Sequence, residues 1–133
     1  MKQTLILIAS LLVCVLNAAA AGPHLRFIDS DTLNLGSFPN TEMRSGEVAI
    51  VNDGDSTLVI LQTFTDCNCT KARPSANIIE AGDTSVIKVT FNGHGRRYGG
   101  FSKIVRLRTN DAAKPLHNIF VKGRISRPWR KEN

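Results

Sequence analysis

The pattern with the most reactive side chains in this sequence is a pair of cysteines separated by one residue, Cys67-Asn68-Cys69. Such a pair suits a labile disulfide, a thiol redox site or part of a soft-metal site. A bond between them would close a loop of about three residues, whose loop entropy is worth only about 1.6 kcal/mol. A functional role would therefore lie in reactivity or ligation rather than in stabilisation. The simplest alternative is that both are small apolar side chains that pack under a loop at a strand end.

The residues that would complete a metal or catalytic site do not accompany these cysteines. Two thiolates cannot fill a tetrahedral zinc site alone. The only histidines, His24, His94 and His117, have no spacing that pairs them with the cysteines. Scattered histidines also argue against a Ser/His/Asp arrangement, and no carboxylate pair is marked by its surroundings. We therefore predict a protein that is not an enzyme and that needs no metal or cofactor.

A second candidate site is the basic segment Arg96-Arg97-Tyr98, which lies in a glycine-rich connection over residues 93–100. Phosphate-cradling loops run from a strand into a helix N-terminus, and here another extended run follows. The sequence therefore disfavours a phosphate loop. It leaves two alternatives, a flexible hairpin connection or a binding loop in which these three side chains meet a partner.

A third candidate is a basic face on the last two extended runs. Four cations share the outward parity there: Arg106, Arg108, Lys122 and Arg124. If the runs pair, the cations share one surface, and like charges that face each other across strands repel. Such a face suits an acidic polysaccharide, an anionic membrane surface or an acidic protein, and the simpler alternative is an ordinary solvated face.

The elements that must position these residues are strands. Apolar side chains alternate with period two over residues 84–91, 101–109 and 116–125, as in strands with one buried face. Residues 57–64 are more continuously apolar, which predicts a central strand covered on both sides. Residues 47–51 form a further strand, and the runs 25–28 and 32–35 predict short edge strands. About seven short strands with turns between them, and no helix with both period and caps, predict an all-β sandwich or small barrel.

The first 21 residues read as a secretory signal peptide. Lys2 precedes an apolar run over residues 5–16, and small residues follow up to Ala21. The run is about 12 residues long, whereas a membrane span needs about 20, so an anchor is the weaker interpretation. A buried N-terminal helix is a further alternative, and so is lipid attachment at Cys14, although Cys14 lies inside the run. Export would place the chain in the periplasm or outside the cell, where disulfides persist.

Length and composition limit the architecture to one domain. The chain has 133 residues, with 17 Lys and Arg against 11 Asp and Glu, hence a formal net charge of +6. A multidomain enzyme is excluded by length, and 42% hydrophobic residues exclude a disordered chain. We predict a signal peptide over residues 1–21, one β domain over residues 22–125 and a basic tail over residues 126–133, with no transmembrane segment after processing.

Several short motifs in this domain resemble the DUF1573 family. They are Cys67-Asn68-Cys69-Thr70, Ile79-Glu80-Ala81-Gly82-Asp83-Thr84, Ile87-Lys88-Val89-Thr90-Phe91, Gly99-Gly100-Phe101-Ser102-Lys103, Thr109-Asn110-Asp111 and the closing Val121-Lys122-Gly123-Arg124-Ile125. The resemblance implies a bacterial exported domain with an immunoglobulin-like antiparallel β-sandwich, similar to the ASPM/SPD-2/Hydin type. It implies no activity, because the family has no known function. The family usually has glycine where this chain has Asn68, and Asn also tolerates left-handed backbone geometry.

Two functional hypotheses follow from these features. The first is a non-catalytic interaction or structural module of the bacterial cell envelope, with an envelope protein or an acidic polysaccharide as partner and no nucleic acid. The alternative is a thiol redox or soft-metal-binding protein that uses Cys67 and Cys69.

Overall fold

The computed structural model describes residues 22–129 and contains nine strands and no helix within them. The predicted signal peptide and the last four residues of the predicted tail lie outside the described residues. The strands are β1 (Leu25–Phe27), β2 (Thr32–Pro39), β3 (Met43–Asn52), β4 (Leu58–Thr65), β5 (Thr70–Pro74), β6 (Ile78–Ile79), β7 (Thr84–Asn92), β8 (Gly99–Thr109) and β9 (Leu116–Ser126).

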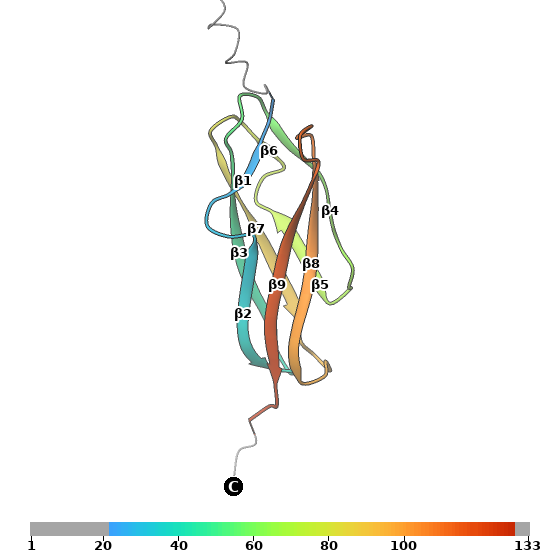
Figure 1. The fold of residues 1–133 in the computed structure, drawn as a ribbon. Coiled ribbons are helices and arrows are strands. Elements are labelled where there is room, and N and C mark those ends of the chain that lie inside the picture. The colour runs from blue at the N-terminus through green and yellow to red at the C-terminus, as the bar shows by residue number, and fades with distance from the viewer. Residues whose placement is uncertain (1–21, 130–133) are drawn as a thin grey trace, which may run out of the picture.

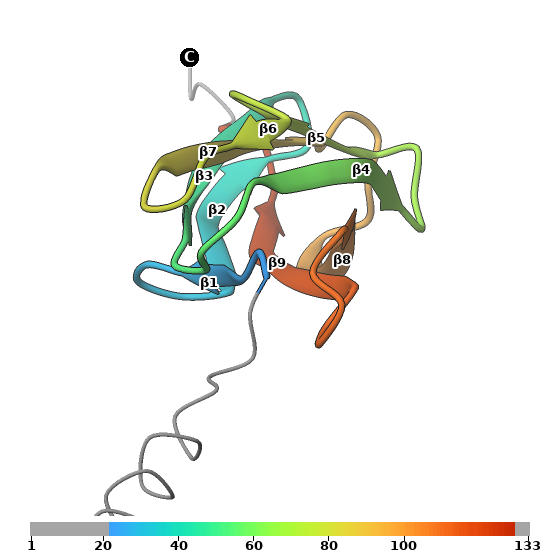
Figure 2. The same ribbon diagram turned by 90° about the horizontal axis from the view of Figure 1, so that it is seen from above.

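The strands form two sheets that enclose one core (Figures 1 and 2). One sheet has the order β1-β3-β7-β5 and the other has the order β2-β9-β8-β4-β6. The predicted all-β sandwich is therefore confirmed. One pair departs from the antiparallel pattern, because β2 runs parallel to β9. The chain crosses from the first sheet to the second between β1 and β2, and this crossover brings β2 alongside the last strand in the same direction.

Period-two burial explains why these segments are strands. On β7, Ile87, Val89 and Phe91 are buried while Lys88 between them is exposed. On β9, Ile119 and Val121 point into the same core. Each strand therefore removes one face of apolar side chains from water, which is the main driving force for the fold.

Three phenylalanines from both sheets fill the lower part of the core. The Phe91 and Phe101 rings are stacked with centroids 4.0 Å apart and an angle of 6° between their planes. Phe38 meets both rings edge-on, with centroids 6.1 Å from Phe91 and 6.0 Å from Phe101. Aromatic contacts of this kind contribute beyond the area they bury, so this cluster ties β2, β7 and β8 together.

Several details of the strand prediction differ from the structure. The run predicted over residues 32–35 extends to Pro39 in β2, and the run predicted over residues 47–51 begins at Met43 in β3. The strand predicted over residues 57–64 is β4, but it is not covered on both sides. Leu61 is 55% exposed, so one face of β4 is open to solvent at this residue. One edge of β4 is open as well, because β6 pairs only with Leu58 and Val59. The short strands β5 and β6 were not predicted, because the exposed Lys71 and Arg73 and the terminal Pro74 hide the apolar pattern of β5.

We predict that Gly123→Ala is destabilising because a Cβ at this position has no room. It would lie 2.6 Å from Cζ of Phe101 and 3.1 Å from the carbonyl oxygen of Gly36. Phe101 would have to leave its stack with Phe91, and overpacking of this kind costs about 1–3 kcal/mol of unfolding free energy. Urea unfolding measures the loss.

The matched control is Gly100→Ala on the partner strand, where the nearest atom to the new Cβ is 3.9 Å away. This variant should unfold at nearly the wild-type urea concentration. Equal losses in the two variants would contradict the packing argument.

Candidate functional site

The predicted cysteine pair forms a disulfide in the turn between β4 and β5. Cys69 is only 2% exposed and belongs to the core, while Cys67 is partly buried against it. The backbone N–H of Cys69 donates a hydrogen bond of 3.1 Å to Cys67 Sγ. The hydroxyl oxygen of Thr65 lies 3.0 Å from the carbonyl oxygens of both Cys67 and Thr70, which share its single proton. The turn is therefore held by its own polar contacts as well as by the bond.

The connection between β7 and β8, which carries Arg96-Arg97-Tyr98, lies against this turn at the lower end of the sandwich (Figure 1). The N–H of Asn92 donates to the carbonyl of Cys69 at 2.7 Å. On its other side, the N–H of Gly93 donates to Glu42 and the N–H of Gly95 donates to Asn40, both in the β2–β3 turn, at 3.0 and 3.1 Å. Gly95 has φ of 68°, which glycine adopts without strain. Backbone hydrogen bonds on two sides thus fix the loop.

These contacts create a cavity of about 480 Å³ that joins two of the predicted sites. The cavity reaches Cys69 at one side and the stacked Phe91 and Phe101 at another. All the charged side chains among its lining residues are positive: Arg96, Arg97 and Lys103. Tyr98 also lines it, and the Arg127 guanidinium lies 5.7 Å from the centre of the Tyr98 ring. We call this feature the cationic cavity.

The predicted basic face is present on β8 and β9, but its four cations do not form one cluster. Arg106 and Arg108 lie opposite Asn118 and Leu116, while Lys122 and Arg124 lie opposite Ser102 and Gly100. The two pairs are four residues apart in the register, or roughly 13 Å at the rise of a strand. Because each cation faces an uncharged residue, the expected repulsion across the strands does not arise. Arg106 is also neutralised by Asp66, at 2.5 Å.

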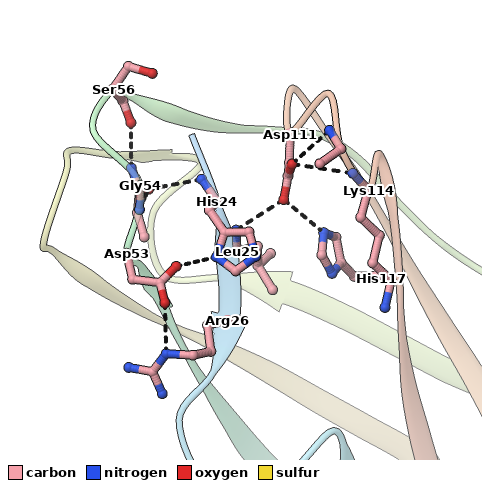
Figure 3. A network of polar contacts seen from close by, with 11 residues as sticks. His24, Leu25, Arg26, Asp53, Gly54, Ser56, Asp111, Lys114 and His117 are labelled. Atoms are coloured by element: carbon pink, nitrogen blue, oxygen red, sulfur yellow. Dashed lines mark hydrogen bonds and ion pairs between the residues drawn. The ribbon is translucent and has the colours of Figure 1, made fainter. Parts of the chain in front are cut away.

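The opposite end of the sandwich holds a polar network that the sequence analysis did not single out (Figure 3). Asn52 is fully buried, and its side-chain amide donates to the carbonyls of Ser56 and Ile79 at 2.8 Å each. Its Oδ1 accepts the N–H of Gly54 at 3.1 Å and that of His24 at 3.3 Å. The sequence places Asn52 in an ordinary turn. The structure shows that its side chain makes four hydrogen bonds, which hold this end of the sandwich together.

Beside Asn52, the carboxylate of Asp53 binds the side chain of Arg26 in β1 and that of His24, the residue just before β1 (Figure 3). His24 Nδ1 contacts one oxygen, and Arg26 Nε donates to the other at 2.9 Å. The hydrogen bond with His24, supported by Arg26, holds the pKa of Asp53 below its ordinary value of 3.8. These contacts fasten β1 to the turn that follows β3.

A second carboxylate, Asp111, fastens β1 to the turn between β8 and β9 (Figure 3). Asp111 is 1% exposed and accepts the backbone N–H groups of Leu25, Ala113 and Lys114 at 3.1–3.3 Å. His117 Nε2 lies 3.7 Å from Asp111 Oδ2, and it has no hydrogen-bond partner among the described residues. Burial lowers the pKa of His117, the positive charge of Lys114 lowers it further, and Asp111 opposes the shift. The imidazole is therefore held in its neutral form.

Residues 22–129 contain neither a metal-ligand cluster nor a helix that could span a membrane. No group of three or more His, Cys, Asp or Glu side chains there is arranged to hold a metal ion. No helix in this part of the chain is long and apolar enough to cross a membrane.

The model of a protein family whose description is "protein of unknown function (DUF1573)" matches residues 27–125, which is most of the chain. The chain belongs to the DUF1573 family. The family predicted from the sequence motifs is therefore confirmed. A search of curated proteins found no match.

Solved structures share the fold of this DUF1573 protein at low sequence identity. A protein of unknown function from Porphyromonas gingivalis W83 is similar with a TM-score of 0.69 and 19% identity, over 84% of this chain and 50% of that one. This chain thus spans about half the length of that protein. The PapD-like domain 7 of human CEP192 has a TM-score of 0.57 and 11% identity, over 80% and 87% of the two chains. The YadV chaperone has a TM-score of 0.56 and 14% identity, over 84% and 54%. These likenesses support the immunoglobulin-like sandwich.

We predict that reduction of the Cys67–Cys69 bond costs little stability. The bond closes so short a loop that its entropic contribution is at most about 1.6 kcal/mol. Urea unfolding with and without dithiothreitol measures the difference. A loss of several kcal/mol, or unfolding on reduction, would show that the bond is a principal support of the fold.

We also predict that stability falls as the pH drops below about 6.5, the ordinary pKa of histidine. Because the folded-state pKa of His117 is lowered, the unfolded chain takes up this proton first, and acid favours unfolding. In urea unfolding between pH 7 and 5, His117→Gln should show a shallower loss of stability than the wild type. The control is His94→Gln in the exposed β7–β8 loop, which should keep the wild-type slope. Parallel slopes in all three proteins would count against His117 as the cause.

Proposed function

We propose that this protein is an exported, non-catalytic interaction module of the bacterial cell envelope that binds an acidic group of its partner in the cationic cavity. The observation that carries the proposal is the charge of the cavity, where Arg96, Arg97 and Lys103 meet without an acidic lining residue among those described. The partner is an acidic polysaccharide or an acidic segment of an envelope protein.

The shape of the cavity supports binding of a compact anion. Its volume of about 480 Å³ lies in the usual range for small-ligand sites. Arginine guanidinium groups bind carboxylate, sulfate or phosphate oxygens through paired, charge-assisted hydrogen bonds. The exposed Tyr98 ring and the half-buried Phe101 ring, which also line the cavity, offer apolar surface to the rest of a sugar or peptide. The loop is already held by backbone hydrogen bonds, so binding orders little additional chain.

The export part of the proposal is supported by two independent features of the chain. The first 21 residues have the charge, apolar run and small residues of a secretory leader. Two cysteines joined in a disulfide are typical of proteins in oxidising compartments.

We predict that the protein binds immobilised heparin, used as a model polyanion, and that Arg96→Ser/Arg97→Ser elutes at clearly lower salt. Fewer contacts to anionic groups also make the affinity depend less steeply on salt. The control is Arg108→Ser/Lys122→Ser, which removes the same charge from the outward face of β8 and β9 and should change elution less.

Two outcomes would contradict the proposal. The first is that the wild-type protein is not retained on the column. The second is that both double variants shift equally, because net charge rather than the cavity would then explain binding.

Thiol–disulfide exchange is a second candidate function, favoured by the position of the bond at the edge of the cationic cavity. In this reaction a thiolate of a partner protein attacks Sγ of Cys67, which is less buried than Cys69. A mixed disulfide forms, and the electron pair of the broken bond leaves on Cys69 as a thiolate. A soft-metal role would require both sulfurs to be reduced first.

We predict for this candidate that the Cys67–Cys69 pair equilibrates with glutathione buffers at a moderate potential. Alkylation of free thiols followed by intact mass measures the reduced fraction. A bond that stays fully oxidised in millimolar reduced glutathione would remove the candidate.

A further inference from the structure

The corner where the chain crosses between the sheets leaves part of β9 without a neighbour. β9 pairs with β8 along the whole stretch from Leu116 to Ile125. On its other side, pairing with β2 begins only at Phe120, opposite Thr32. The preceding strand β1 does not continue this pairing, because it belongs to the other sheet and pairs with β3. The first four residues of β9 therefore have an open edge.

The register shows which backbone groups point out of this edge. Thr109 donates its N–H to Pro115, so residues 117 and 119 direct their backbone groups toward β8. Residues 116, 118 and 120 direct theirs away from β8, and Phe120 indeed donates its N–H to Asp31. The N–H and C=O groups of Leu116 and Asn118 are thus left facing the corner. No described residue pairs with them in a strand ladder.

The edge of β1 faces the same corner from the other sheet. The backbone carbonyl of His24 accepts the N–H of Asp53, and the N–H of Ile28 donates to the carbonyl of Ala49. The backbone groups of the even-numbered residues in and beside β1 therefore bond to β3. The odd-numbered Leu25 and Phe27 point away from β3. The N–H of Leu25 is taken by Asp111, in the turn that leads into β9. The remaining groups, C=O of Leu25 and both backbone groups of Phe27, form a second open edge.

A cavity of about 660 Å³ lies between these two edges. Leu25 and Phe27 of β1 line one side, and Leu116, Asn118 and Phe120 of β9 line the other. Figure 2 shows β1 and β9 as neighbours at this corner of the sandwich. Inside, the Phe27 and His117 rings meet edge-on with centroids 6.3 Å apart. Leu116 at the mouth is 48% exposed.

We propose that this corner binds an extended peptide segment of a partner protein as an added β-strand. The segment takes the place beside β9 that β2 would fill if β2 began four residues earlier. Its backbone bonds to the N–H and C=O groups of Leu116 and Asn118, which supplies affinity independent of sequence. Its inward side chain is small and apolar, because it meets the Phe27 and His117 rings.

The charges of the corner favour a peptide strand over an anionic ligand. Its rim carries both signs: Arg26 and Lys114 are positive, while Asp29 and Asp31 are negative. Arg26 is already paired with Asp53. The corner therefore differs in chemistry from the cationic cavity, and the two sites can be tested separately.

The free edge of β5 makes a useful contrast. There only Ala72 has both of its outward backbone groups free, because Thr70 donates its N–H to Cys67 and Pro74 has no N–H. Proline and exposed cations such as Lys71 are devices that prevent strand addition at an edge. The β9 edge has neither between Leu116 and Ile119.

The test uses the uncharged pentapeptide acetyl-Thr-Val-Thr-Val-Thr-amide as the probe and amide NMR of the protein as the readout. We expect saturable binding with a dissociation constant on the order of 1 mM, the range of a few backbone hydrogen bonds. The largest shift changes and slowed hydrogen exchange should fall on the amides of Leu116, Asn118 and Phe27. The same peptide with N-methyl groups on every backbone amide should not bind, because it lacks the backbone donors on both of its edges.

Two matched proline variants of the protein provide a second test in the same titration. Asn118→Pro removes only an outward N–H, which a strand edge tolerates, and should weaken binding about tenfold or more. Ala72→Pro removes an outward N–H from β5 and should leave binding unchanged. The proposal is overturned if the N-methylated peptide binds equally well, or if the shift changes lie at β5. It is also overturned if the chemical shifts of the β9 amides do not change at about 10 mM peptide, tenfold above the expected dissociation constant.

Discussion

The requirement that buried backbone groups find hydrogen-bond partners shapes both ends of this sandwich. Inside the sheets, the strand ladders meet the requirement. At the lower end, the loops meet it by bonding to one another, as Asn92 does with Cys69 and Gly93 does with Glu42. At the upper end, the side chains of Asn52 and Asp111 supply the missing partners. Where the chain crosses between sheets, the exposed Leu116 and Asn118 have no strand neighbour on their outer side among the described residues, and this corner is where we place a partner strand.

The mutual bonding of the lower loops also explains the cationic cavity. Loop cations usually spread into solvent, where their fields are screened. Here the β7–β8 connection is tied to two other turns, so Arg96 and Arg97 are carried to the same hollow as Lys103. The disulfide contributes geometry rather than stability, since it closes a very short turn while placing Cys69 in the core. Charge held in a fixed hollow is better suited to recognition than the outward face of β8 and β9, where the cations are spaced apart.

Period two in the sequence was enough to predict the fold class and most strands, because burial alternates along β7 and β9 and along most of β8. It could not predict β5, whose Lys71 and Arg73 lie outward next to a terminal proline, nor the exposure of Leu61, which lies at the register shift between Ile60 and Gln62 in the pairing of β4 with β8. The candidate residues at Cys67 and Arg96 were recognised from type alone. Their proximity was not predictable, because it rests on hydrogen bonds between turns far apart in the chain. The roles of Asn52 and Asp111 were missed for the same reason.

If the loops at the disulfide end form a fixed anion site, an NMR titration with an oligosaccharide will locate the bound anion there. The ligand is a short galacturonate oligosaccharide, and the observed signals are the backbone amides and the arginine Nε–H groups. We expect saturable shifts that concentrate on Arg96, Arg97, Tyr98 and Lys103. Shifts that instead map to Arg106, Arg108, Lys122 and Arg124, or that grow linearly without saturation at every cation, would contradict this expectation.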